Sequence, residues 1–258
     1  MEGDRIYSIC ITNYNSINSI RQSINSIYPL LLDERFESVV IDNYSNDGSY
    51  EYLSDLFKQN IITSLIRIKS NRGTGRNEAF MHFTGRYIIA NIDMDVIYDH
   101  RRILSAIHEY HSRFEGKVLS VYGMMIMPRK IASLLGGWKN LDRHEDNEIA
   151  LNAFSRNLHA QDLSINVVID HLNRNRNHLS RVKVGYLHYR DFMRIGFKPS
   201  DAGIKEILTP EFLIALVLYR FKPNFRYREF SEYFKIWKSQ KVYGEIIKNA
   251  DKVEENVN

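Results

Sequence analysis

The 258-residue sequence has a single cysteine, five prolines and no long apolar run. Because Cys10 has no second cysteine to pair with, no disulfide can form within the chain, which is typical of proteins from a reducing compartment. The longest apolar run, residues 212–219, is far shorter than the roughly 20 residues that cross a bilayer. The first residues carry charges and no apolar stretch, so we expect no signal peptide and a cytoplasmic location.

Neither sign of charge dominates the chain. There are 35 lysines and arginines against 31 aspartates and glutamates, a net charge of +4 that does not by itself indicate nucleic-acid binding. The apolar fraction of 44% and the charged fraction of 26% are those of a folded globular protein. The length predicts one large domain or two small ones, with a substantial core.

Short β-branched runs alternate with amphipathic stretches up to residue 110. We expect strands at residues 6–12, 36–41, 65–68 and 87–92, each followed by a helix, and this order predicts a parallel sheet with right-handed crossovers. Further along we expect a strand at 117–127, a short helix at 129–135, a helix opening at Glu145, strands at 163–169 and 182–189, and a helix after Pro210.

Two carboxylates, Asp93 and Asp95, follow the predicted strand at residues 87–92. Ligands of open α/β sheets bind at the carboxyl ends of strands, and paired carboxylates suit Mg²⁺ or Mn²⁺. Asp residues that cap the next helix are an equally simple interpretation. The turn at residues 71–77 contains two glycines and two arginines before a helix, a pattern that favours anion binding but also occurs in ordinary loops.

Basic and aromatic side chains alternate over residues 220–243. Such a segment can lie on an anionic membrane surface, stack on single-stranded nucleic acid, or pack its aromatic side chains on the protein with its lysines in water. The sequence leaves these three interpretations open.

Several of these turns together resemble the family 2 inverting glycosyltransferases of the GT-A fold. The resemblance covers about residues 7–154, with a weaker trace to 198. The motifs that carry it are Thr12-Asn13-Tyr14-Asn15, Asp42 with Asn46-Asp47-Gly48-Ser49, Asn71-Arg72-Gly73 with Gly75-Arg76-Asn77-Glu78-Ala79, Gly85-Arg86-Tyr87, Asp93-Met94-Asp95, Gly136-Gly137-Trp138 and Glu145-Asp146.

The resemblance implies an α/β, Rossmann-like and mostly parallel sheet flanked by helices, with a C-terminal helical extension rich in aromatic and basic residues. Residues 1–100 would form the nucleotide-sugar-binding half, 101–200 the acceptor-binding half and 201–258 the extension. The resemblance places the donor against Thr12, Asn13, Asn15, Asp42, Arg76 and Asp93, a Mn²⁺ or Mg²⁺ ion on Asp95 with His188 as a further ligand, the catalytic base at Asp146, and the acceptor beside Trp138 and Glu145.

By this resemblance the expected activity is metal-dependent, inverting transfer of one sugar, with a UDP-sugar as donor and a glycan, lipid-linked or protein acceptor. The Gln-x-x-Arg-Trp signature of processive synthases is absent, which favours single transfer. The pair Asp42-Asn43 departs from the two acids of many family members. Alternatives are a non-catalytic module that binds nucleotide sugar or a membrane surface, and a nucleotidyltransferase. Residues 212–243 could contact a membrane or form a homodimer, whereas nucleic acid ranks last as a partner.

Overall fold

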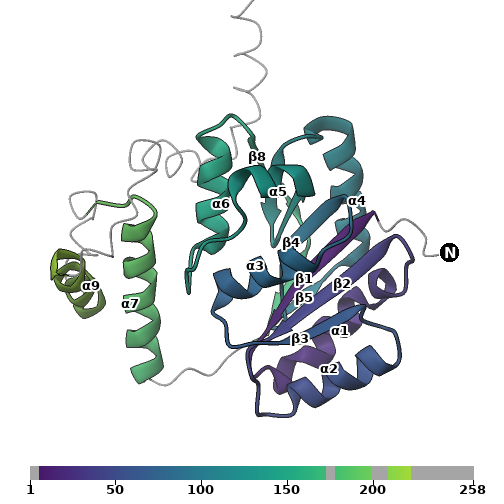
Figure 1. The fold of residues 1–258 in the computed structure, drawn as a ribbon, viewed down its shortest axis with the longest axis horizontal. Helices are drawn as coiled ribbons and strands as arrows, with labels where there is room; N and C mark the ends of the chain where they lie inside the picture. Colours follow the sequence, from purple (N-terminus) through teal and green to yellow (C-terminus); the bar gives the residue numbers. More distant parts are fainter. Residues whose placement is uncertain (1–5, 173–177, 199–208, 222–258) are drawn as a thin grey trace, which may run out of the picture.

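The computed structural model describes residues 6–172, 178–198 and 209–221 (Figure 1). A seven-stranded sheet in the order β3-β2-β1-β4-β7-β6-β8 forms the centre, and a two-stranded sheet pairs β5 with β9. The first half of the chain contains β1 (Tyr7–Asn13), α1 (Ile17–Leu31), β2 (Phe36–Asp42), α2 (Ser49–Lys58), β3 (Ser64–Arg67), α3 (Arg72–His82), β4 (Tyr87–Asp93), β5 (Val96–Tyr98) and α4 (His100–Glu109).

The four predicted parallel strands are confirmed. Strand β1 pairs in parallel with β2 and β4, and β2 pairs in parallel with β3. The second half of the chain contains a π-helical turn η1 (Tyr110–Phe114), β6 (Val118–Tyr122), β7 (Met124–Pro128), α5 (Arg129–Leu135), α6 (Glu145–Phe154), β8 (His159–Asn166), β9 (Val168–His171), α7 (His178–Arg194) and α9 (Pro210–Phe221).

Three strand predictions in the second half are wrong. The expected strand at 117–127 is a hairpin, because Gly123 adopts a left-handed φ of 91° and reverses the chain between β6 and β7. The expected strand at 163–169 is divided between β8 and β9, which belong to different sheets. The expected strand at 182–189 lies inside helix α7, where Tyr186, Tyr189 and Met193 recur at spacings of three and four and pack in one cluster.

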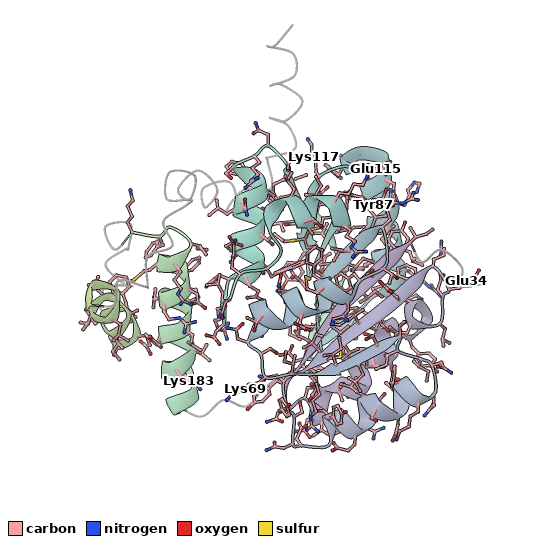
Figure 2. The ribbon with its side chains drawn as sticks, viewed as in Figure 1. Glu34, Lys69, Tyr87, Glu115, Lys117 and Lys183 are labelled. Atoms are coloured by element: carbon pink, nitrogen blue, oxygen red, sulfur yellow. The ribbon has the colours of Figure 1, made fainter. Side chains whose placement is uncertain are left out.

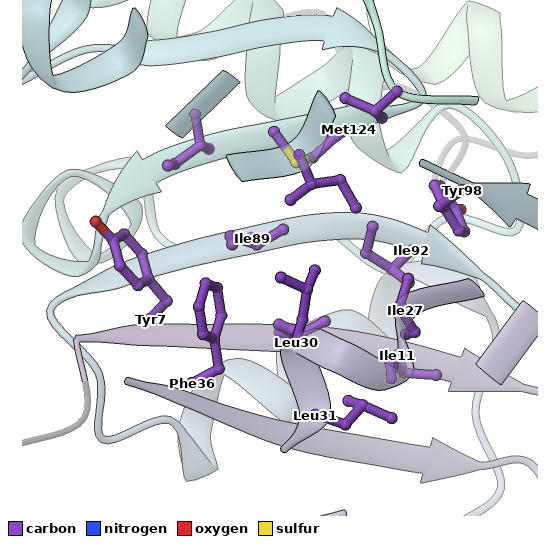
Figure 3. Close-up of a cluster of buried hydrophobic side chains, with 14 of the residues drawn as sticks. Tyr7, Ile11, Ile27, Leu30, Leu31, Phe36, Ile89, Ile92, Tyr98 and Met124 are labelled. Atoms are coloured by element: carbon purple, nitrogen blue, oxygen red, sulfur yellow. The ribbon is translucent and has the colours of Figure 1, made fainter. Parts of the chain in front are cut away.

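Two clusters of buried apolar side chains cover opposite faces of the main sheet. Along β1, Ile9 and Ile11 belong to the first cluster and Cys10 to the second, as the two-residue period of a strand requires. Helices α1, α2 and α4 supply the first cluster, and α3, α5 and α6 supply the second. In Figure 3, Leu30 of α1 lies among strand residues of the first cluster such as Phe36 and Ile89.

A third cluster joins the late helices to the rest of the protein. Phe212 of α9 and Met193 of α7 pack with Leu141 and Leu151, so both helices lie on the α6 side of the sheet (Figure 1). Within the described ranges, no helix is both long and apolar enough to span a membrane. Most of the basic-aromatic segment, residues 222–243, lies outside the described residues, and its predicted role stays a prediction.

Candidate active site

The carboxyl ends of β1, β2 and β4 meet at one edge of the sheet because the three strands are parallel. In the strand register, Thr12 of β1 lies opposite Asp93 of β4, and Asn13 lies opposite Asp42 of β2. Four of the residues predicted to bind a donor are therefore neighbours at this edge.

Two of these four residues bind each other. The Asn13 side chain donates to Asp42 Oδ1 at 2.8 Å, and Asp42 Oδ2 accepts the backbone N–H of Ser45 at 3.0 Å. The Asp42 side chain is completely buried, with the Arg67 Nε atom 3.4 Å away. One carboxylate oxygen of Asp42 thus binds Asn13 of β1 and the other binds the turn after β2. A contact from Asp42 to a nucleotide base remains a prediction.

Asn15 connects the turns that follow β1 and β2. Its backbone N–H donates to Ser45 Oγ at 3.0 Å, and its side-chain oxygen accepts the Asn46 N–H at 3.0 Å. The residue is exposed and has a left-handed φ of 46°. The structure therefore places Asn15 beside the strand ends, where it holds the loop that follows β2.

A cavity of about 480 Å³, here called the strand-end cavity, lies over this edge. Helix α7 forms one of its walls with Lys183, Val184 and Leu187; Lys183 lies near the start of that helix (Figure 2). Its size falls within the usual range for small-molecule sites. Its charged or strand-end lining residues are Thr12, Asn13, Arg72, Asp93, Asp95, Asp142, Arg143 and Lys183.

Asp93 and Asp95 stand half-buried at the turn between β4 and β5. The backbone N–H of Asp93 donates to the Tyr98 hydroxyl at 2.8 Å, and Asp93 Oδ1 lies 3.3 Å from Arg76 Nη2. The negative charge of Asp93 raises the pKa of Arg72 against the opposing effect of burial. The two carboxylates have the chemistry of a Mg²⁺ or Mn²⁺ site that relies on one or two protein ligands and on substrate phosphates.

The described part of the chain contains no group of three or more His, Cys, Asp or Glu side chains arranged to hold a metal. His188, predicted as a further ligand, lies on α7 with its Nδ1 atom 2.8 Å from His144 Nε2. It lines neither the strand-end cavity nor the cavity described next. Metal binding by His188 therefore stays a prediction, and the structure shows its contact with His144.

A second cavity of about 370 Å³, the inner cavity, adjoins the first. Both cavities share Arg72, Asp93 and Arg143, so these three residues stand where the cavities meet. Asp146, in the first turn of α6, lines the inner cavity, and its Oδ1 atom accepts the Asn147 N–H at 2.8 Å. The predicted base and the predicted metal carboxylates thus line two adjoining cavities.

A buried ion pair forms the wall next to Asp146. Arg76 of α3 donates to Glu145 of α6, and the two residues are only 3% and 2% exposed. Burial raises the pKa of Glu145 to about 7, although the Arg76 guanidinium acts to lower it. Burial acts to lower the pKa of Arg76, but the negative charges of Glu145 and Asp93 outweigh it and raise that pKa. Arg76, predicted near the base or phosphate, is thus placed between two carboxylates.

The loop that follows α5 packs tightly on α3. A Cβ atom on Gly73 would lie 1.9 Å from the Lys139 carbonyl oxygen, so only glycine allows this approach. The Gly73 N–H donates to the Leu141 carbonyl at 2.9 Å. In this structure the N–H of the glycine turn, which was predicted to bind an anion, is therefore bonded to the loop after α5. Arg72, from the same turn, lines both cavities.

Trp138 lies in this loop but points into the protein core. Its ring is 3% exposed and meets Phe80 edge to face, with centroids 6.1 Å apart. Trp138 lines neither cavity, so the structure places this predicted acceptor residue away from both walls, whereas Glu145 does line the inner cavity.

Two site residues escaped the sequence analysis. Arg143 lines both cavities, and the fully buried Asp191 of α7 accepts the backbone N–H groups of Asp142 and Arg143 at 2.8 and 2.9 Å. Burial raises the pKa of Asp191, and Arg190 opposes that shift. Asp191 lies 49 and 48 positions from Asp142 and Arg143 in the sequence, so no local pattern indicates these contacts.

Comparison with known proteins identifies the family of the chain and proteins that share its fold. A family model described as "Glycosyl transferase family 2" matches residues 8–175. The chain is also 36% identical over 92 residues to a Bacillus subtilis (strain 168) protein named "Uncharacterized glycosyltransferase YfnE". That match covers 35% of this chain and 23% of the relative.

Solved structures share the fold at low sequence identity. A mannosyltransferase from Pyrobaculum calidifontis in complex with GDP-Man and Mn²⁺ has a TM-score of 0.58 at 16% identity, over 93% of this chain and 81% of that one. A fragment of S. aureus TarS in complex with UDP-GlcNAc scores 0.57 at 16% identity, over 85% and 74%. Glucosyl-3-phosphoglycerate synthase from Mycobacterium tuberculosis, with Mn²⁺, UDP-glucose and glycerol 3-phosphate, scores 0.55 at 15% identity, over 70% and 78%. The chain therefore has the GT-A fold.

Proposed function

Because the chain belongs to glycosyl transferase family 2, we propose that it moves one sugar from a UDP-sugar to an acceptor hydroxyl, with a divalent metal and with inversion at the anomeric carbon. One observation carries the proposal. The carboxylates Asp93 and Asp95 line a cavity that shares Asp93 with a second cavity, which Asp146 lines.

The donor would occupy the strand-end cavity. Arg72, Arg143 and Lys183 line it, and positive groups fixed near a diphosphate stabilise the charge that grows on it as the sugar leaves. Solved neighbours in complex with UDP-GlcNAc, UDP-glucose and GDP-Man support a nucleotide-sugar donor. Two of these three ligands are uridine nucleotides, which is the reason for proposing UDP first.

Asp93 and Asp95 would hold Mn²⁺ or Mg²⁺. When bound, the cation supplies positive charge to the diphosphate leaving group. The two aspartates therefore bind the donor and orient it, with the anomeric carbon toward the inner cavity. Mn²⁺ in the P. calidifontis and M. tuberculosis neighbours supports a divalent ion at this position.

Asp146 would act as the general base. An acceptor hydroxyl in the inner cavity gives its proton to the Asp146 carboxylate while its oxygen forms a bond to the anomeric carbon. The bond from that carbon to the diphosphate oxygen breaks, and the nucleoside diphosphate departs with the electron pair. Attack from the side opposite the leaving group inverts the anomeric configuration.

A thermal-shift screen tests donor binding directly, since a ligand that binds only the folded state raises its melting temperature. We expect UDP and UDP-sugars to raise the melting temperature with Mn²⁺ and to do so less with EDTA. NMR of the product would then show an anomeric configuration opposite to that of the donor. A retained configuration would contradict the proposed single displacement, and a shift by other nucleotides alone would contradict the UDP assignment.

A further inference from the structure

The outward side of helix α9 is apolar. Its exposed residues recur at positions i, i+3, i+4 and i+7, so they form one stripe along the helix. They are Pro210, Leu213, Ile214 and Val217, here called the α9 stripe. The last three side chains are 48%, 45% and 54% exposed. The solvent side of a surface helix normally carries charged and polar residues, so a continuous apolar stripe there indicates a contact surface.

The inner side of α9 is already packed on the protein. Phe212 is buried and meets Tyr189 of α7 edge to face, with ring centroids 5.2 Å apart. Ala215 is also buried, and a Cβ atom on Gly185 of α7 would lie 2.6 Å from the Glu211 Cγ atom, so the two helices are in close contact. These contacts fix which side of α9 faces outward, and the helix lies beyond α7 at the edge of the molecule (Figure 1).

Positive charge is concentrated in the sequence directly after the stripe. Residues 220–243 contain seven lysines and arginines and two glutamates, which gives a net charge of +5. Because the whole chain has a net charge of +4, the rest of it carries −1. Eight of the 24 residues in this segment are aromatic, against 12% in the whole chain. Basic and aromatic residues next to an apolar helix face are the combination that favours an anionic membrane surface.

A membrane fits these features better than a protein or nucleic-acid partner does. A second copy of the chain would bring another segment of net charge +5 beside the first, and four exposed residues are far fewer than the roughly 20–30 that each partner supplies to a stable interface. Single-stranded nucleic acid would engage the charges and the aromatic rings but would leave the aliphatic stripe in water. A lipid bilayer offers apolar chains to the stripe and anionic headgroups to the basic residues.

We propose that α9 docks the protein on the surface of an anionic membrane. Leu213, Ile214 and Val217 enter the boundary between headgroups and acyl chains, and the basic residues after Val217 contact the headgroups. With 12 residues, α9 is too short to span a bilayer, so it lies along the surface. Because α9 packs on α7, and α7 forms a wall of the strand-end cavity, docking brings that cavity within one helix of the membrane side. The inference does not depend on sugar transfer and can fail independently of the proposed function.

Vesicle flotation with the full chain tests the proposal without any activity measurement. The probes are vesicles of phosphatidylcholine alone and vesicles with about one third phosphatidylglycerol, whose surface attracts basic residues. We expect the protein to float with the anionic vesicles and not with the neutral ones. Raising the salt from about 0.1 to about 0.5 M NaCl should weaken binding at least about tenfold, because salt screens the attraction.

Two variants separate the apolar contribution from the charge. Leu213→Gln/Ile214→Gln/Val217→Gln removes the larger side chains of the α9 stripe and keeps every charge, so affinity for anionic vesicles should fall by about tenfold or more. Lys235→Gln/Lys238→Gln/Lys241→Gln keeps the stripe and removes three positive charges, and it should weaken binding by a similar factor.

The matched control replaces three exposed apolar residues that lie elsewhere. Leu32, Met81 and Leu134 are 60%, 67% and 56% exposed, and they belong to the end of α1, to α3 and to α5. Their simultaneous change to glutamine should leave vesicle affinity unchanged. A loss as large as that of the stripe variant would show that binding does not depend on α9, which overturns the proposal.

The remaining outcomes also decide the matter. Failure of the wild-type chain to float with anionic vesicles, or equal flotation with neutral ones, would overturn the assignment of an anionic membrane. A wild-type dimer in light scattering that becomes a monomer in the stripe variant would assign the stripe to a second copy of the chain. A stripe variant that keeps vesicle binding but melts at a lower temperature would show that the stripe packs within the chain. Each of these results excludes membrane docking through α9.

Discussion

Replacing Arg76 with methionine would leave the Glu145 carboxylate buried without its guanidinium. Arg76 and Glu145 are both almost completely buried, so water cannot take over the lost contact. Removing one member of a buried ion pair costs about 3–5 kcal/mol at a pH where the other member stays charged. We therefore expect Arg76→Met to lose that much stability at pH 8.

The loss should shrink at low pH. Burial raises the pKa of Glu145 from 4.5 to about 7 already in the wild type, so the folded state binds a proton more tightly than the unfolded state does. Between these two pKa values the folded state binds more protons than the unfolded state does. The free energy of unfolding of the wild type therefore falls as the pH rises through this range, by about 3 kcal/mol in all. Without Arg76 the pKa of Glu145 in the folded state rises further, so stability continues to fall to higher pH. At pH 5 the Glu145 carboxyl is neutral, and the loss of its partner should lower the free energy of unfolding by only about 1–3 kcal/mol.

Urea unfolding of the wild type, Arg76→Met and Arg76→Met/Glu145→Gln at pH 5, 6, 7 and 8 measures this difference. Glu145→Gln should remove the pH dependence, because it carries no titrating proton. Arg102→Met is the control, since the Arg102 side chain is 58% exposed in a surface ion pair and should change stability by less than about 0.5 kcal/mol. Parallel stability curves for the wild type and Arg76→Met across this range would show that the guanidinium does not stabilise the buried carboxylate.

Three further predictions concern the site. Gly73→Ala puts a Cβ atom against the Lys139 carbonyl, so it should lower the melting temperature and reduce transfer; a wild-type melting curve would contradict the close approach. Asp191→Ala leaves the Arg143 N–H without its acceptor, so it should weaken donor binding more than Asp191→Asn does, as titration calorimetry would measure; equal affinities would contradict the positioning role. Asp95→Ala should abolish the Mn²⁺ dependence of donor affinity, and unchanged dependence in the same titration would remove Asp95 from the metal site.

The first half of the fold could be predicted because local pattern and tertiary structure agree there. The β-branched runs at residues 6–12, 36–41 and 87–92 are mostly buried in the sheet, the run at 65–68 forms a half-buried edge strand, and the helices turn apolar faces toward the sheet. In the second half the deciding features are not local. Gly123 lies within the predicted strand at residues 117–127, and the chain reverses at its left-handed backbone conformation. Helix α7 forms in a segment where apolar residues also alternate.

The candidate site divides in the same way. Thr12, Asn13, Asp42 and Asp93 could be placed together because parallel strands bring their carboxyl ends to one edge. Pairing between side chains could not be predicted, so the partners of Asp42 and Arg76 emerged only from the structure.

Other positions depend on contacts that leave no local pattern. Trp138 is buried against Phe80, and Arg143 is held by Asp191 of a distant helix. Asn91 lies in a bulge of β4 and its carbonyl accepts a hydrogen bond from Tyr98. The uninterrupted run of strand residues in the sequence gives no sign of this bulge.

The measurement that bears most directly on the proposed chemistry compares donor binding and sugar transfer in Asp146→Asn. The asparagine side chain would keep the size of the aspartate but could not take a proton, so transfer should fall at least about a hundredfold. Donor affinity in the presence of Mn²⁺ should stay within about twofold of the wild type, since Asp146 lines the inner cavity and not the strand-end cavity. Transfer at the wild-type rate, or loss of donor binding together with transfer, would contradict the role of Asp146 as the general base.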